Sequence, residues 1–226
     1  MRATRSKPCS QAGPTEISAR QCLNCAPEAI EPNTVKSILF LLATVFLMPA
    51  LTPVGRAADR FTPEPGFLSL FNGQDLTGWC YLPGDIFDGK QESSDARYSA
   101  KDGVLTVHPQ TPRQLSKIWT TQEFPKDFVL RLEFRAEVNA DSGIFLRKPQ
   151  LQCRDYLVAG PFKELKKYRS QDWNEIEVVV KDGVARCTCN GEVLEEALKL
   201  PPTGPIGFEG DRGQMEYRRI RLKELP

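Results

Sequence analysis

Charged side chains that alternate along one predicted strand are the first candidates for chemistry in this sequence. Residues 128–135 have the sequence FVLRLEFR, which puts Glu133 between Arg131 and Arg135 on one face. A carboxylate between two cations stays ionised at neutral pH, and a strand holds it rigidly, as a general base requires. Such a face is either the floor of a binding site or a solvated exterior, and the alternation leaves both interpretations open.

Two predicted strands and the turn between them must position these charges. A period of two over residues 128–135 predicts a strand with one apolar and one polar face. The segment NADSG at 139–143 has turn-forming residues, and residues 144–147 begin a second strand that ends on Arg147. We therefore expect a hairpin whose polar face presents Arg131, Glu133, Arg135 and Arg147.

The composition is typical of a globular chain with many turns. Of the 226 residues, 26% are charged and 40% are hydrophobic, which is ordinary for a folded domain. A formal net charge of +1 without a basic run gives no indication of a nucleic-acid partner. Eighteen prolines and sixteen glycines favour short strands over long helices.

Turn signals divide the chain after residue 65 into short strands. KDG at 101–103 and DG at 182–183 predict two hairpins, and the weakly helical segments are 162–169 and 193–198. About ten to twelve strands predict an all-β jelly-roll sandwich of two antiparallel sheets. We expect the terminal strand at 217–225 to bury Ile220 and Leu222 beside a first strand at 66–71.

The first 65 residues are expected to lie outside this domain. Residues 35–58 contain Lys36, an apolar run at 38–51 and small residues up to Ala58, which predicts a secretory signal peptide. Residues 59–65 would then be a linker and 66–226 the domain. The apolar run is shorter than the about 20 residues of a membrane span. We expect an exported protein, periplasmic or extracellular, without membrane contact unless the signal stays uncleaved.

A polar segment, residues 1–34, precedes the predicted signal peptide. It contains four prolines, shows no hydrophobic period, and is too long for the charged start of an ordinary signal peptide. We hypothesise that Val35 is the true initiator, so that residues 1–34 are a leader that is not translated.

Four of the seven cysteines follow the predicted signal peptide: Cys80, Cys153, Cys187 and Cys189. An even number of cysteines in an exported protein permits disulfides. Cys187 and Cys189 lie two residues apart on one predicted strand, so they cannot easily bond to each other. Buried thiols and disulfide bridges both stay open.

Several motifs occur in the order and spacing of a known family. FLSLFNGQDLTGW at 67–79 resembles LFNGKDLTGW, the opening of the 3-keto-disaccharide hydrolase domain, which is abundant in exported bacterial proteins. The further matching motifs are KDGVL at 101–105, FVLRLEFR at 128–135, DSGIFLR at 141–147, GPIGF at 204–208 and YRRIRLKEL at 217–225. The resemblance covers residues 66–225 and implies a concanavalin-like jelly roll, in agreement with the strand pattern.

Two segments depart from the family pattern. Where family members usually carry YEVQILD and a long loop, this chain has LQCRDYL at 151–157 and a short connection to Trp173. Where they tend to carry QDHG, this chain has EGDRG at 209–213. The departures leave the expected fold intact and make the catalytic activity the open question.

The resemblance implies cleavage of 3-keto-disaccharides or other 3-keto-glycosides. A ketone at C3 acidifies the proton at C2, so a base can remove it and the glycosidic bond can break by elimination, followed by hydration. We predict Glu133, Arg147 and Glu209 as catalytic residues, with Glu133 as the base and with Arg131 and Arg147 stabilising the enolate. The predicted substrate-binding residues are Arg131, Gln152, Asp155, Asp211, Arg212 and Trp119.

The remaining expectations concern the tryptophans, cofactors and an alternative function. Trp119 is the best candidate for stacking on a sugar, whereas Trp79 and Trp173 lie in fold-defining motifs and are expected in the core. The single histidine, His108, argues against a zinc site, and we expect no cofactor, with calcium held by acidic loop residues such as Asp211 left as an alternative. The alternative function is a non-catalytic carbohydrate-binding or envelope module on the same fold.

Overall fold

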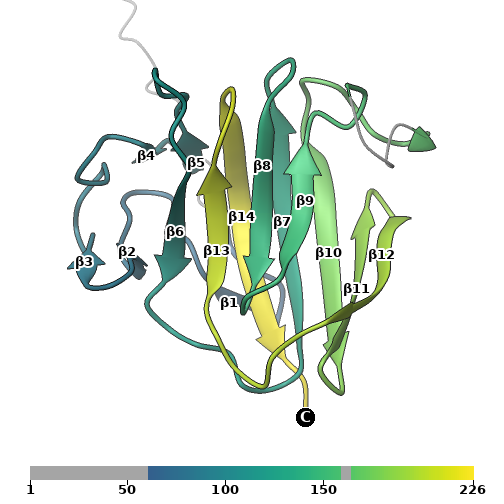
Figure 1. Ribbon diagram of the computed structural model, residues 1–226. Coiled ribbons are helices and arrows are strands. Elements are labelled where there is room, and N and C mark those ends of the chain that lie inside the picture. Colours follow the sequence, from purple (N-terminus) through teal and green to yellow (C-terminus); the bar gives the residue numbers. More distant parts are fainter. Residues whose placement is uncertain (1–60, 159–163) are drawn as a thin grey trace, which may run out of the picture. The chain divides into compact units, whose positions relative to one another are not determined.

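The computed structural model describes residues 61–158 and 164–226, and its elements are the strands β1 to β14 (Figure 1). The predicted leader, the predicted signal peptide and the first two residues of the linker lie outside the described residues. The part that is described contains no helix with the length and apolar content that a membrane crossing requires.

Two antiparallel sheets form the fold, and we name them sheet A and sheet B. Sheet A has the order β12 (Glu192–Lys199), β11 (Val184–Cys189), β10 (Asn174–Lys181), β7 (Phe128–Ala136), β14 (Met215–Glu224), β5 (Val104–Val107) and β4 (Tyr98–Lys101), and β1 (Leu68–Ser69) also pairs with β14. Sheet B has the order β3 (Asp85–Ile86), β2 (Trp79–Tyr81), β6 (Ser116–Thr120), β13 (Ile206–Gly210), β8 (Asp141–Leu146) and β9 (Gln150–Arg154). The predicted all-β sandwich is confirmed.

The core lies between the two sheets and explains the alternation in the sequence. The apolar side chains of β7 are fully buried, and the residues between them are half-buried on the outer face of sheet A. In Figure 1, β13 and β8 lie in front of β14 and β7, and side chains from all four strands join one core cluster. The two-faced strand predicted at 128–135 is therefore confirmed.

The predicted hairpin between 128–135 and 144–147 is wrong. Strand β7 pairs with β10 on one side and with β14 on the other, so both of its edges are taken. The turn at 137–140 therefore carries the chain to sheet B, where β8 pairs with β13 and β9. Turn chemistry predicted the reversal correctly, but it could not tell which sheet the next strand joins.

The pairing predicted for the two ends of the domain is confirmed, with a change of register. Leu68 of β1 pairs with Leu222 of β14, and Ile220 and Leu222 are buried. Strict alternation along β14 would place Tyr217 on the face opposite Ile220, yet both residues are fully buried in the core. The pairing register of β14 shifts after Arg218, where a β-bulge inserts an extra residue.

Some of the other local predictions are confirmed and others are wrong. The hairpins at 101–103 and 182–183 are confirmed, while residues 193–198 belong to strand β12 and not to a helix. Of the other weakly helical segment, 162–169, residues 162 and 163 lie outside the described part and 164–169 form no α-helix. Cys80, Cys153, Cys187 and Cys189 are buried free thiols.

The segment that precedes β1 is fastened to the outer face of sheet A. Arg221 of β14 donates two hydrogen bonds to Glu64, from Nε to Oε2 at 2.6 Å and from Nη2 to Oε1 at 2.8 Å. The side chain of Arg221 is 7% exposed, so the pair is shielded on one side. These bonds lower the pKa of Glu64 from 4.5 to about 2.

We expect Glu64→Gln to lower the unfolding temperature at neutral pH by about 2–4 °C, the shift that roughly 1 kcal/mol gives in a chain of this size. The folded-state pKa of Glu64 is depressed, so its contribution is present above 4.5 and is lost as the pH falls through about 2. Thermal denaturation of both proteins between neutral pH and pH 2 should show the two unfolding temperatures converging.

Glu224→Gln is the matched control, because its partner Lys126 is exposed and such a pair contributes little. A difference between wild type and Glu64→Gln that does not shrink on acidification would contradict the assignment.

Candidate functional site

An aromatic stack in the core fixes which side chains of β13 face outward. The Phe208 ring lies between Trp79, with centroids 5.3 Å apart, and Tyr217, with centroids 4.3 Å apart. Neighbouring residues on a strand point to opposite faces, so Gly207 and Glu209 lie on the outer face of sheet B. The candidate site is built around Glu209 on this face.

Two residues from other strands of sheet B act on Glu209, one from β6 and one from β9. Lys117 of β6 is its register partner, and the side-chain amide of Gln150 on β9 donates a 2.8 Å hydrogen bond to its Oε2. Gln150 reaches Glu209 by crossing over Gly143 of β8, where a Cβ atom would lie 2.0 Å from its Nε2. The glycine is therefore required for this hydrogen bond.

Burial raises the pKa of Glu209 above the ordinary carboxyl value, since the residue is 8% exposed. The positive charge of Lys117 and the hydrogen bond from Gln150 oppose the rise, whereas the negative charges of Asp211 and Asp141 add to it. A carboxylate with a raised pKa is more basic and is a suitable general base near neutral pH.

Ion pairs occupy the outer face of sheet B on one side of Glu209. The guanidinium of Arg113 binds both oxygens of Asp211, with 2.6 Å between Nη2 and Oδ2. Asp141 accepts a 2.6 Å hydrogen bond from Gln152 and lies 3.5 Å from Arg154. Arg212 lies 3.8 Å from the same Asp141 carboxylate. We name Asp141, Asp211 and their arginine partners the charged end of the face.

Aromatic side chains lie on the other side of Glu209. Trp119 and Phe145 have ring centroids 5.4 Å apart, and Lys117 Nζ lies 4.3 Å from the centroid of Phe145. Gly207 lies beneath Trp119, because a Cβ atom there would be 2.6 Å from Trp119 Cε3. The half-exposed Trp119 ring therefore lies flat enough over the strand to form part of the surface.

The structure brings together five of the predicted site residues and separates the others. Glu209, Gln152, Asp211, Arg212 and Trp119 belong to the outer face of sheet B. Glu133 and Arg131 lie on the outer face of sheet A, on the opposite side of the sandwich. There Glu133 is bound by Arg218 at 2.7 Å and by Arg219 at 2.9 Å.

The expectation that Arg147 shares a face with Glu133 is wrong. Arg147 follows the last residue of β8 in sheet B and is 6% exposed, and its guanidinium donates to the carbonyls of Pro201 and Lys126 at 2.8 and 2.6 Å. Asp155 is also removed from the outer faces. It is 3% exposed and accepts hydrogen bonds from Asn139 N and from the Tyr168 hydroxyl. Both residues fasten loops.

Two further tryptophans, Trp79 and Trp173, were both expected in the core. Trp79 is fully buried, as expected. Trp173 was expected in the core, but it is half-exposed on the outer face of sheet A, with the Arg218 guanidinium 3.9 Å from its ring centroid. Family motifs predicted a structural role for Trp173 without indicating which face it occupies.

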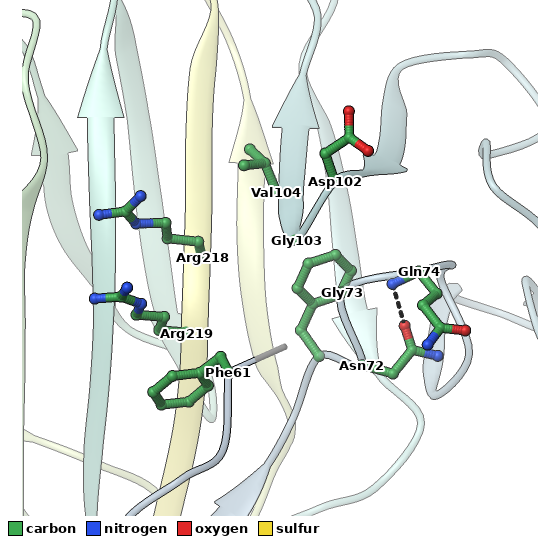
Figure 2. A pocket seen from close by; sticks show the side chains of 10 residues that line it. Phe61, Asn72, Gly73, Gln74, Asp102, Gly103, Val104, Arg218 and Arg219 are labelled. Carbon is green, nitrogen blue, oxygen red and sulfur yellow. Dashed lines mark hydrogen bonds between the residues drawn. The ribbon is translucent and has the colours of Figure 1, made fainter. Parts of the chain in front are cut away.

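A pocket of about 200 Å³ lies on the side of sheet A (Figure 2). It is lined by Phe61, the 72–74 turn, the start of β5 and the residues Arg218 and Arg219, whose guanidiniums are already bound to Glu133. Ligand pockets usually have volumes of about 300–1,000 Å³, so this hollow is small for a disaccharide. A wider hollow beside it, about 580 Å³, lies along β4 and has no aromatic lining residue. We prefer the outer face of sheet B, because it combines a basic carboxylate with aromatic side chains.

Residues of the site that were not predicted include Lys117, Gln150, Phe145 and Asp141, and also Arg113 and Arg154 at the charged end. Alternation around the apolar Ile118 would have placed Lys117 beside Trp119, because both flank it on one short strand. Among residues 61–158 and 164–226, no group of three His, Cys, Asp or Glu side chains could hold a metal ion. Asp211, the calcium candidate, has both oxygens bound to Arg113.

Two antiparallel sheets packed on one aromatic core define a β-sandwich of the concanavalin type. The chain belongs to the 3-keto-disaccharide hydrolase domain family, whose profile, described as the 3-keto-alpha-glucoside-1,2-lyase-like domain, matches residues 66–223. The resemblance found in the motifs is thereby confirmed.

Solved structures share the fold at low sequence identity. A candidate glycosyl hydrolase from Parabacteroides distasonis ATCC 8503 is 17% identical, with a TM-score of 0.59 over 74% of this chain and 99% of that one. A second from the same organism is 18% identical, with a TM-score of 0.52 over 70% of this chain and 99% of that one. A search of curated proteins found no match.

We expect Gln150→Ala to raise the pKa of Glu209 further, because it removes a hydrogen bond that favours the charged carboxylate. The measurement is an NMR titration of the Glu209 side-chain carboxyl carbon. Gln152→Ala is the matched control, since that amide bonds Asp141 instead and should leave the Glu209 titration in place. An unchanged or lowered pKa in Gln150→Ala would show that the amide does not control this carboxylate.

Proposed function

We propose that this domain is an exported enzyme that cleaves 3-keto-glycosides by elimination, with Glu209 as the base. The observation that carries the proposal is the burial of Glu209, which raises its pKa, on a sheet face that also presents Lys117 and Trp119. The family description names a 1,2-lyase, and elimination across C1 and C2 is the reaction that such a name denotes.

The proposed reaction begins with the transfer of the C2 proton to Glu209. The electron pair of the C2–H bond moves to the C3 ketone and forms an enolate. When the ketone re-forms, a C1–C2 double bond is made and the C1–O bond to the leaving group breaks. The leaving oxygen takes the proton from Glu209, which restores the base. Water can then add to the unsaturated product.

Lys117 replaces the arginines in the role of enolate stabiliser. Its charge acts on Glu209, and its ammonium group lies over Phe145 on the same outer face of sheet B. A fixed cation placed where charge develops lowers the energy of the transition state. Gln150 and Gln152 present side-chain amides that can bind sugar hydroxyls.

A non-catalytic carbohydrate-binding module is the second candidate function. It is favoured by the hydrogen bonds and ion pairs that already engage the carboxylates of Asp141 and Asp211. It is also favoured by the replacement of the family's QDHG segment by EGDRG at 209–213. The two functions differ in whether Glu209 is needed for turnover or only for affinity.

We expect Glu209→Gln to reduce the turnover of a 3-keto-glycoside by about 10²-fold or more, because glutamine keeps the shape and cannot take the C2 proton. The measurement is the release of the leaving alcohol or sugar from 3-keto-trehalose and 3-keto-lactose by the purified domain. Circular dichroism and a thermal transition check that the variant is folded.

Glu133→Gln is the matched comparison, because it makes the same change on the opposite sheet. Its turnover should stay near that of the wild type. A loss of turnover in Glu133→Gln with none in Glu209→Gln would show that Glu133, on sheet A, is the base. Equal sugar binding by all three proteins without cleavage would establish the binding module.

A further inference from the structure

An apolar strip crosses sheet B next to Glu209. Register pairs connect Phe145 to Gly207, Gly207 to Trp119, Trp119 to Cys80, and Cys80 to Ile86. Paired residues share a face, so these side chains form one row across β8, β13, β6, β2 and β3. Neighbouring strands are about 4.8 Å apart, so the row is about 19 Å long.

The strip is open along part of its length. Ile86 is 51% exposed and Trp119 is half-exposed, whereas Phe145 and Cys80 are buried beneath their neighbours. Gly207 has no side chain, so the Trp119 ring can lie over β13 where the strip passes Glu209. The row therefore presents a half-exposed indole and, further out, an exposed isoleucine.

The apolar strip lies next to the proposed base, Glu209, on the same face of β13. Gly207 and Glu209 are two residues apart, which is about 6.6 Å along a strand. On the other side of Glu209, the same spacing leads to Asp211 and the charged end, where arginines are bound to the carboxylates. A ring bound over Glu209 thus has an apolar neighbour on one side and ion pairs on the other.

We infer that the apolar strip binds the leaving group of the substrate, and that Trp119 determines which leaving groups are accepted. This inference rests on the proposed function. The strip takes a leaving group with a flat apolar ring face, which a sugar presents through its C–H groups and an aryl alcohol through its ring. The charged end cannot hold such a ring without separating ion pairs, so the orientation of the substrate is fixed. The exposed Ile86 extends the strip beyond the first ring and accommodates a longer leaving group.

The test compares methyl, glucosyl and phenyl 3-keto-glucosides as substrates of the wild type and of Trp119→Ala. Phenol leaves more readily than methanol in any environment, so the informative quantity is the change of each kcat/KM on mutation. We expect Trp119→Ala to lower kcat/KM about tenfold for the glucosyl and phenyl substrates and to leave the methyl substrate unchanged. The loss should appear mainly in KM, and Trp119→Phe should restore most of it.

Trp173→Ala is the matched control, because it removes a half-exposed indole from the other sheet. It should leave all three substrates unchanged. An equal loss for the three substrates in Trp119→Ala, or no loss, overturns the inference while the proposed function stands. If only the glucosyl or only the phenyl substrate responds, that ring is the one the strip binds. If the wild type cleaves none of the three, the proposed function fails and the inference falls with it.

Discussion

The stack of Trp79, Phe208 and Tyr217 is the contact on which the arrangement of this domain depends. These three rings come from β2, β13 and β14, so they join the two sheets through the middle of the core. Each aromatic pair contributes roughly 0.5–1.5 kcal/mol beyond the free energy of burying its surface. The Tyr217 hydroxyl also lies 2.8 Å from Ser142, which donates to the backbone carbonyl of Glu209 at 2.6 Å. With Phe208 fixed inward, Glu209 is fixed outward.

The two outer faces of the sandwich differ because their charges are compensated in different ways. On sheet A, the β-bulge in β14 brings two consecutive arginines to Glu133, and residues 61–67 lie against Arg131 and Arg221. There Glu133 is bound by two arginines, and Arg131 and Arg221 are paired with Glu177 and Glu64. On sheet B, Glu209 accepts a hydrogen bond from the neutral amide of Gln150 and is affected by the positive charge of Lys117, but it also lies near the carboxylates of Asp141 and Asp211. Burial and the two neighbouring carboxylates raise the pKa of Glu209, which makes it a better base than an ordinary exposed carboxylate.

Glycines determine the shape of the candidate site as much as the charged residues do. Gly143 allows Gln150 to cross β8 and reach Glu209, and Gly207 allows the Trp119 ring to lie over β13. At both positions a methyl group would collide with the functional side chain. These glycines belong to the DSGIFLR and GPIGF motifs, so in this chain the two motifs also keep space for Gln150 and Trp119.

The sequence by itself determined the class of fold, most of the strands and the family. Alternation, glycine turns and short motifs are local properties of the sequence. They were sufficient to predict β7, the two tight hairpins and the pairing of the first strand with the last. Of the site, the sequence identified Glu209, Gln152, Asp211, Arg212 and Trp119 as candidates, because a polar or aromatic residue beside a strand motif can be recognised without coordinates.

The tertiary structure decided which of these residues meet. Alternation assigns a face to a side chain only relative to its own strand, so it could not show that β7 and β8 enter different sheets or that a bulge realigns β14. For that reason Glu133 and Arg147, neighbours in the predicted hairpin, are apart in the fold, while Glu209 and Trp119, 90 positions apart in the sequence, share one face through the pairing of β13 with β6.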